Sequence, residues 1–106
     1  MTLAEAAKSM ADAGHGSLGV FADRALVGIF TERDLLRALG AGVEPTTEPV
    51  ENWMSRDPDV FHPDTDVEEA ARWLLESGYR HLPVVEEGEL LGIVSVRDLL
   101  RAVLEP

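Results

Sequence analysis

Apolar residues recur along this chain with a helical period in some stretches and in short runs in others, and the same order of stretches occurs twice. Spacings of three and four over residues 3–11, and again over 67–75, predict two amphipathic helices. Each is followed by a glycine, Gly14 or Gly78, the residue that most readily ends a helix. Each is also preceded by a capping-box pattern: Thr2 with Glu5, and Asp66 with Glu69.

A pair of short apolar runs follows each of these helices and indicates two strands joined by a tight turn. The runs are 18–21 and 26–30 in the first copy, and 82–85 and 90–94 in the second. A further helix then begins at Thr31 or Ser95 and carries apolar residues on one face: Leu35, Leu36 and Leu39, or Leu99, Leu100 and Val103. Each copy is therefore predicted to fold as helix, strand, strand and helix.

The two copies are an internal duplication with an offset of 64 residues. Residues 6–39 align with 70–103 without a gap, and fourteen of the 34 positions are identical. The stretch between the copies is rich in Gly, Pro and Thr and predicts a linker with one helical turn around residues 50–54. We therefore predict one α/β (α+β) module made of a repeat over 1–39, a linker over 40–56 and a second repeat over 57–106.

The second copy begins with a segment that the first copy does not have. Residues 59–62 predict a short strand ahead of the helix over 67–75. The chain starts directly at the corresponding helix of the first copy, so the first copy is expected to be truncated at its start.

Composition narrows the classes of function. Twenty acidic and nine basic side chains give a formal net charge of −11, which opposes binding to nucleic acids and anionic membranes. The absence of cysteine excludes thiol catalysis, zinc–thiolate sites and iron–sulfur clusters. No apolar run approaches the roughly 20 residues that span a bilayer, and the N-terminus has no signal-peptide pattern, so a cytoplasmic location is expected.

Residues 14–19, GHGSLG, match the G-x-G-x-x-G pattern of dinucleotide-binding loops. Such a loop must follow a strand and open a helix, so that amides at the helix start face the pyrophosphate. GHGSLG is predicted to close a helix and lead into a strand, and the second copy, GYRHLP, keeps only the first glycine. The match is therefore rejected as a nucleotide-binding loop.

The segments TERD (31–34) and SVRD (95–98) place a hydroxyl and an aspartate at a predicted strand-to-helix turn. One interpretation is structural: the pattern [ST]-x-x-[DE] is a capping box that closes the helix start. The other is functional, because free amides and a hydroxyl at such a turn bind phosphate, and a carboxylate accepts from both hydroxyls of a ribose. Both interpretations stay open for Thr31, Asp34, Ser95 and Asp98.

The run YRHLPVVEEGELLGIVSVRDLL resembles the second half of a CBS domain, a family named after cystathionine beta-synthase, and FADRALVGIFTERDLL is similar to the matching part of another. WMSRDPDVFHPDTDVEEAARWLLESG also resembles the opening of that family's second repeat. The resemblance implies two (β)-α-β-β-α repeats packed with pseudo-twofold symmetry, here with a first repeat that lacks its N-terminal strand, and often a disc-like homodimer. It also implies a regulatory, signal-transducing module that senses adenosyl compounds in the cleft between the repeats, and not a catalyst.

The same resemblance implies the residues of two ligand pockets. The ribose is expected on Asp34 or Asp98, with Thr31 or Ser95 beside it, and the base against Ile29 or Ile93. Phosphate near Asp98 is expected to meet Arg80 and Arg33. Phosphate near Asp34 is expected to meet Arg97, with His81 or Tyr79 as further contacts, because Gly16 stands where Arg80 would align. The Asp98 pocket is therefore favoured for a phosphorylated ligand, and the missing first strand is expected to leave one pocket open or filled by a symmetry-related copy.

Other roles remain open for these residues. Arg33 and Arg97 also suit solvated or paired positions at helix starts, and His81 suits a packing position. Trp53 and Trp73 are expected to pack, and His15 and His62, without carboxylates at ligand spacing, to bind no metal.

The sequence leaves the ligand open among AMP, ADP, ATP, adenosine and S-adenosylmethionine, and requires no cofactor. The alternative function is a structural dimerisation or interaction module with no small-molecule ligand. An enzyme is disfavoured, because Ser17 lies in no nucleophile motif and no serine, histidine and carboxylate form a recognisable set. The regulated partner protein is not identified.

Overall fold

The computed structural model describes residues 1–104, which fall into two compact units. The first unit runs from Met1 to Pro58, and the second begins at Asp59. Each unit combines helices with antiparallel strands, which confirms the predicted mixed fold class. The stretch 40–56 lies within the first unit. The predicted boundaries of repeats and linker stay predictions.

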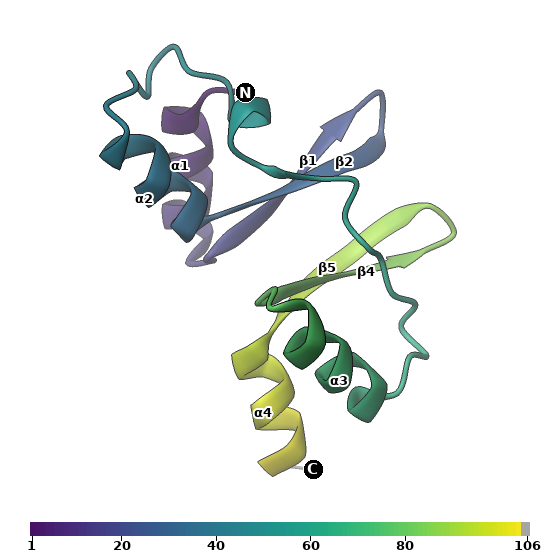
Figure 1. Ribbon diagram of the computed structural model, residues 1–106. Coiled ribbons are helices and arrows are strands. Elements are labelled where there is room, and N and C mark those ends of the chain that lie inside the picture. The colour runs from purple at the N-terminus through teal and green to yellow at the C-terminus, as the bar shows by residue number, and fades with distance from the viewer. Residues whose placement is uncertain (105–106) are drawn as a thin grey trace. The chain divides into compact units, whose positions relative to one another are not determined.

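The first unit contains two helices beside a three-stranded antiparallel sheet with strand order β1-β2-β3. Its elements are α1 (Leu3–Ala13), β1 (Ser17–Ala22), β2 (Ala25–Thr31), α2 (Glu32–Gly40), a 3-10 helix (Val50–Asn52) and β3 (Ser55–Arg56). Figure 1 shows α1 and α2 side by side at one end of the β1–β2 hairpin. The 3-10 helix confirms the predicted turn within the linker.

Helix α1 begins and ends where the sequence predicts, at a capping box and at a glycine. Thr2 and Glu5 form the full capping box: the Thr2 N–H donates to Glu5 Oε1 (3.0 Å) and the Glu5 N–H donates to Thr2 Oγ1 (3.2 Å). Gly14 follows α1 with φ of 69°, in the left-handed region that glycine adopts without strain. GHGSLG therefore closes a helix and enters β1, as predicted.

The stretch 44–56 packs against the first unit and completes its core. The backbone N–H of Leu3 donates to Glu48 O (2.9 Å), and that of Val50 donates to Met1 O (3.0 Å). Val50 and Met54 are buried against residues from both helices and the hairpin. The whole buried cluster is Leu3, Ala6, Met10, Val20, Phe30, Ala38, Val50 and Met54.

The sequence did not predict strand β3, and Gly28 is what makes room for it. Ser55 and Arg56 pair with Ile29 and Gly28. A Cβ atom on Gly28 would lie 2.3 Å from Met54 Sδ and 2.9 Å from the carbonyl oxygen of Ser55. Only glycine therefore allows the chain to approach β2 this closely.

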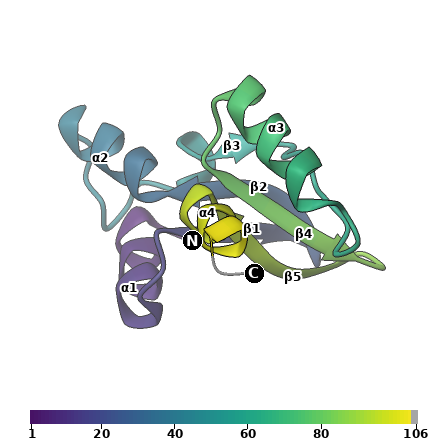
Figure 2. The ribbon, with the colours of Figure 1, turned by 90° about the horizontal axis from the view of Figure 1, so that it is seen from below.

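The second unit has the same order of helix, hairpin and helix. Its elements are α3 (Val67–Ser77), β4 (His81–Glu86), β5 (Glu89–Ser95) and α4 (Val96–Leu104). Figure 1 and Figure 2 both show α3 alongside β4. Its core is formed by Ala70, Leu74, Leu82 and Leu99. Gly78 ends α3 with φ of 77°, which confirms the predicted stop.

Two expectations about the start of the second unit were wrong. The strand predicted over 59–62 is reduced to a single parallel bridge between Phe61 and Val84. Among residues 1–104 two hydrogen bonds hold it, from Phe61 N–H to Pro83 O (2.9 Å) and from Val85 N–H to Phe61 O (2.7 Å). Asp66 caps α3 by accepting from the Glu68 N–H (3.4 Å), and no return bond from Glu69 occurs among the described residues.

The two hairpin turns differ in a residue that affects their stability. Asp23 and Arg24 have φ of 50° and 70°, and Glu87 and Gly88 have φ of 49° and 81°. Two positive φ values in a two-residue loop define a type I′ turn, in which glycine is favoured at the second position. Only the second hairpin has that glycine, so Arg24 holds an unfavourable backbone conformation.

Exchanging these residues tests the strain directly. A side chain in the left-handed region costs about 1–2 kcal/mol, part of which glycine offsets by its greater freedom in the unfolded chain. Arg24→Gly is therefore expected to raise the free energy of unfolding by about 0.5–1 kcal/mol, and Gly88→Arg to lower it by about as much. Urea unfolding measures both. Equal midpoints for both variants and the wild type would contradict the assignment of strain.

Candidate functional site

Both predicted capping boxes form at the strand-to-helix turns. In the first unit the Thr31 N–H donates to Asp34 Oδ2 (2.9 Å) and the Asp34 N–H donates to Thr31 Oγ1 (3.2 Å). In the second unit the Ser95 N–H donates to Asp98 Oδ2 (2.8 Å) and the Asp98 N–H donates to Ser95 Oγ (3.1 Å). The structural interpretation of these motifs is thus confirmed in both copies, and it leaves the Oδ1 atom of each aspartate for a second role.

Asp34 uses its second oxygen within the protein. Its side chain is buried, and Oδ1 accepts from Arg37 Nη1 at 2.9 Å. The Arg37 guanidinium lies over the ring of Trp53, 5.7 Å from the centroid, and Trp53 Nε1 donates to Glu48 Oε2 (2.9 Å). Asp34 is therefore part of a chain of contacts that connects α2 to the 44–56 stretch.

Asp98 is exposed and keeps its second oxygen available. No hydrogen bond within residues 1–104 falls on its Oδ1. The backbone N–H of Ser95 is the largest cause that holds the pKa of Asp98 below its ordinary value of 3.8, and the Ser95 hydroxyl and the positive charges of Arg101 and His81 act in the same direction. Partial burial opposes them. The carboxylate therefore stays ionised and can accept hydrogen bonds from a ligand.

This lowered pKa predicts a pH dependence of stability. The unfolded chain binds a proton on Asp98 at a higher pH than the folded chain does, so the stabilisation is complete above pH 3.8 and is lost as the pH falls through the lowered pKa. Asp98→Asn removes this dependence while it keeps an acceptor for the Ser95 N–H. The difference in melting temperature between wild type and Asp98→Asn is expected to shrink from pH 6 toward pH 3. A difference that does not vary with pH would contradict the prediction.

Further residues of the predicted second pocket lie at the same turn. The Val96 N–H donates to the carbonyl oxygen of Arg80 (3.1 Å), and His81 pairs with Ser95 across the hairpin. Arg80 is exposed and forms no ion pair within the described part of the chain, whereas His81 and Ile93 are half-buried. The second unit thus groups Arg80, His81, Ser95 and Asp98 at one turn.

The first unit presents different chemistry at the equivalent turn. Gly16 replaces Arg80, and a Cβ atom there would lie 3.3 Å from the carboxyl carbon of Glu32. Glu32 itself stands where the second copy has Val96. Ile29 is buried, unlike Ile93. Acidic side chains at this turn oppose an anionic ligand, so the second unit is the better candidate for a phosphate.

Two of the remaining predicted contacts are exposed and free of ion pairs in residues 1–104. Arg33 lies near the start of α2 in the first unit, and Arg97 lies near the start of α4 in the second. Neither forms the local pair with Glu32, Asp34 or Asp98 that the sequence left open. Their contacts with a ligand stay predictions.

The aromatic residues and His62 have structural surroundings. Trp73 meets Phe61 edge to face, with centroids 5.1 Å apart, and stacks on Tyr79 at 5.8 Å. Packing of Trp53 and Trp73 is thus confirmed. That His62 binds no metal stays a prediction. Its Nδ1 lies 3.5 Å from Asp64 Oδ2 and its Nε2 lies 3.8 Å from Glu86 Oε2. No cluster of three metal-ligating side chains occurs among the described residues.

The sequence did not identify two arginines that act on the aspartates. Arg37 binds Asp34, and Arg101 lowers the pKa of Asp98. Both follow their aspartate by three positions, which places them on the same helix face. This spacing of three positions could have identified both arginines from the sequence.

Two α/β units, each with a capped strand-to-helix turn, define a tandem-repeat module. The model of the CBS domain matches residues 1–41 and 50–105. The chain therefore belongs to the CBS domain family.

The helices of residues 1–104 include none with the length and hydropathy of a bilayer-crossing segment.

Similar proteins come from several organisms. A relative from Acidianus ambivalens, described as a 17.7 kDa protein in the bps2 3' region, is 44% identical over 107 residues, which cover 99% of this chain. The chain spans 64% of that relative's length and 53% of the length of protein MK0525 from Methanopyrus kandleri, to which it is 33% identical.

Solved structures have the same fold. A protein with CBS domains from Burkholderia ambifaria gives a TM-score of 0.90 at 31% identity, over 98% of this chain and 77% of that one. The CBS domain protein PAE2072 from Pyrobaculum aerophilum, complexed with AMP, gives 0.87 at 30% identity, over 97% and 82%. The CBS domain pair of protein MJ0100, in complex with 5'-methylthioadenosine and S-adenosyl-L-methionine, gives 0.85 at 27% identity, over 97% and 85%.

Proposed function

We propose that this chain is a regulatory module that binds an adenosyl compound at the Asp98 turn and thereby changes the state of an attached or partner protein. Two similar CBS-domain structures contain such compounds, AMP in one and methylthioadenosine with S-adenosylmethionine in the other. Ligand binding regulates a partner only if the ligand has different affinities for two states of the assembly.

The observation that carries the proposal is the second oxygen of Asp98. Oδ2 is fixed by the Ser95 N–H, which orients the carboxylate, while Oδ1 accepts no hydrogen bond from residues 1–104. The two hydroxyls of a ribose would donate to such an ionised, exposed carboxylate. Asp34 has no equivalent free oxygen, because Arg37 occupies it.

The neighbouring residues suit the other parts of the ligand. Arg80 is exposed at the same turn and would bind a phosphate, and the half-buried Ile93 would contact the base. The net charge of −11 opposes a triphosphate more strongly than a monophosphate or a cationic adenosyl compound. AMP and S-adenosylmethionine are therefore the first compounds to test, ahead of ADP and ATP.

A thermal-shift panel of AMP, ADP, ATP, adenosine and S-adenosylmethionine tests the proposal. A ligand at 100 times its dissociation constant adds about 2.7 kcal/mol to stability, which raises the melting temperature of a domain of this size by several degrees. Asp98→Asn is expected to abolish the shift, and Arg80→Ala to reduce it for phosphorylated ligands alone. No shift with any compound at millimolar concentration, from folded protein, would overturn the proposal.

A dimerisation module is the second candidate, and the exposed apolar side chains of α2 and α4 favour it. Leu36 is 70% exposed, and Leu100, Val103 and Leu104 are 57%, 61% and 77% exposed. Apolar surface of this kind is often covered by a protein partner. Sedimentation of the wild type and of Leu100→Arg distinguishes the cases, since a dimer that uses this face would dissociate in the variant.

A further inference from the structure

The two units differ in what covers the apolar side of their hairpins. In the first unit the chain returns after α2 and places Val50, fully buried, and Met54, 8% exposed, into the core. It then continues as β3 along the edge of β2, where Ser55 pairs with Ile29. One segment therefore supplies both a buried methionine and an added strand.

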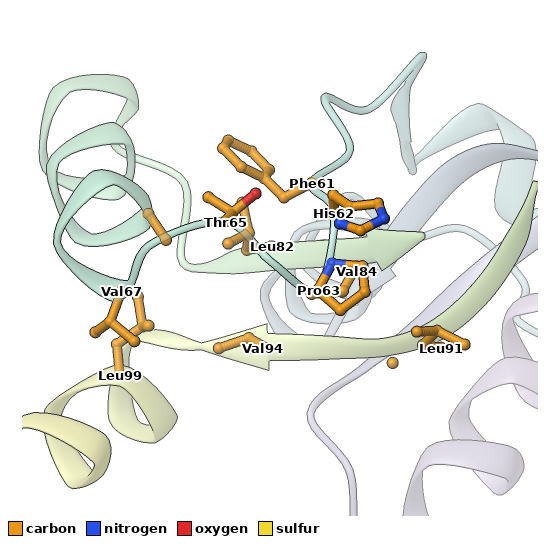
Figure 3. A pocket seen from close by; sticks show the side chains of 12 residues that line it. Phe61, His62, Pro63, Thr65, Val67, Leu82, Val84, Leu91, Val94 and Leu99 are labelled. Carbon is orange, nitrogen blue, oxygen red and sulfur yellow. The ribbon is translucent and has the colours of Figure 1, made fainter. Parts of the chain in front are cut away.

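The second unit has a hollow on its hairpin that the described residues leave unfilled. The hollow has a volume of about 370 Å³ and is lined mainly by apolar side chains from α3, α4, both strands and the segment 61–65 that leads into α3 (Figure 3). Val67 and Leu99 lie at one end of it and Leu91 at the other. Leu91 is 58% exposed, although the corresponding Val27 packs against the first core.

Several residues that line this hollow have counterparts in the first unit that pack against the stretch 44–56. With the offset of 64, Val67, Ala70 and Gly92 correspond to Leu3, Ala6 and Gly28. Leu3, Ala6 and Met54 belong to one buried cluster. The hollow therefore corresponds to a place that the first unit fills from its own chain.

Gly28 and Gly92 show the difference most directly. A Cβ atom on Gly28 would collide with Met54, whereas a Cβ atom on Gly92 meets nothing within 4 Å. β5 also pairs with β4 on one side alone, so its other edge is open among the described residues. The second unit thus keeps the glycine and the open strand edge that a docked segment uses in the first.

We propose that this hollow and the β5 edge form a docking site for an extended peptide segment of a partner protein. The segment would add a strand to β5 and insert a methionine, or a similar unbranched apolar side chain, over Gly92. Strand addition supplies backbone hydrogen bonds, and a flexible thioether adapts to an irregular apolar hollow. This site is separate in its chemistry from the Asp98 turn, because it needs no charged ligand group.

A peptide with the sequence of residues 49–57, PVENWMSRD, is the probe, since this segment fills the corresponding place in the first unit. It is titrated into the isotope-labelled chain of residues 1–106 and followed by backbone NMR shifts. Saturable shifts are expected along β5 and α3. A Met54→Ala version of the peptide is expected to bind at least about tenfold more weakly, because the Met54 side chain is buried in the corresponding place of the first unit.

Gly92→Ala is the matching change in the protein. It should leave the melting temperature unchanged, since the new methyl group has no atom within 4 Å. It should weaken the binding of the peptide at least about tenfold, because the methyl group fills the space over the strand. Gly40→Ala also adds a methyl group in open space, away from the hollow, and should bind the peptide like the wild type.

Three outcomes would overturn the proposal. One is the absence of saturable shifts up to about 1 mM peptide, a concentration that detects even weak binding. Another is equal affinity for Gly92→Ala and the wild type. The third is a set of shifts confined to β2 that respond to Gly28→Ala instead, which would show that the peptide exchanges with the segment of the first unit.

Discussion

Replacing Gly28 with alanine is expected to lower the free energy of unfolding by about 2–3 kcal/mol, as overpacking of a well-filled core does. The new methyl group would lie 2.3 Å from Met54 Sδ and 2.9 Å from the carbonyl oxygen of Ser55. Met54 is flexible and can move, but the carbonyl oxygen belongs to the backbone of β3. The sheet must therefore separate at this point, or β3 must detach.

Gly92→Ala is the matched control for this substitution. It makes the same chemical change at the same position of the other hairpin, where nothing lies within 4 Å. Its effect on the free energy of unfolding is expected to stay within about 0.5 kcal/mol. Urea unfolding followed by Trp53 and Trp73 fluorescence measures both variants. Equal effects at the two glycines would contradict the close packing of β3.

The second large effect is expected at Asp34. Asp34→Ala removes an acceptor from the Thr31 N–H and the ion pair with Arg37, and leaves a small cavity at a position that is 6% exposed. We expect a loss of about 2–3 kcal/mol in the free energy of unfolding. Asp98→Ala removes the same capping box from an exposed position and is expected to cost about 1 kcal/mol.

Arg37→Ala separates the two contributions of Asp34. It keeps the capping box and removes only the partner of Oδ1, so it should cost less than Asp34→Ala. If Asp34→Ala and Asp98→Ala destabilise equally, Asp34 does not have the structural role described above.

Signals that act within a few residues could be predicted from the sequence. Thr2 with Glu5, Gly14 and Gly78 fix the ends of helices through bonds to neighbouring backbone groups, and each has the predicted role. The hairpins could be predicted in the same way, from pairs of short apolar runs joined by a tight turn. The duplication then transferred the order of helix, strand, strand and helix from one copy to the other.

Features that depend on distant contacts could not be predicted in this way. β3 has two residues and exists because Gly28 lets it approach, so the run around Ser55 has no strand pattern of its own. The segment 59–62 has such a pattern, but within the described part of the chain it forms a single bridge, between Phe61 and Val84. A strand needs a free neighbouring edge as well as suitable residues.

The difference between the two aspartates also arises outside their motifs. Asp34 and Asp98 have the same capping geometry, and each is followed by an arginine three positions later. In the first unit Trp53, from the stretch after α2, lies against Arg37, which pairs with Asp34. No described residue holds Arg101 in this way, so the second copy retains an exposed carboxylate.

Calorimetric titration of AMP into wild type, Asp98→Asn and Asp34→Asn tests whether Asp98 holds the ligand, with S-adenosylmethionine as a second titrant. We expect the wild type to bind at least one of the two compounds, Asp98→Asn to weaken this binding at least about tenfold, and Asp34→Asn to bind within about twofold of the wild type. Binding that survives Asp98→Asn, or that is lost in a folded Asp34→Asn variant instead, would contradict this role of Asp98.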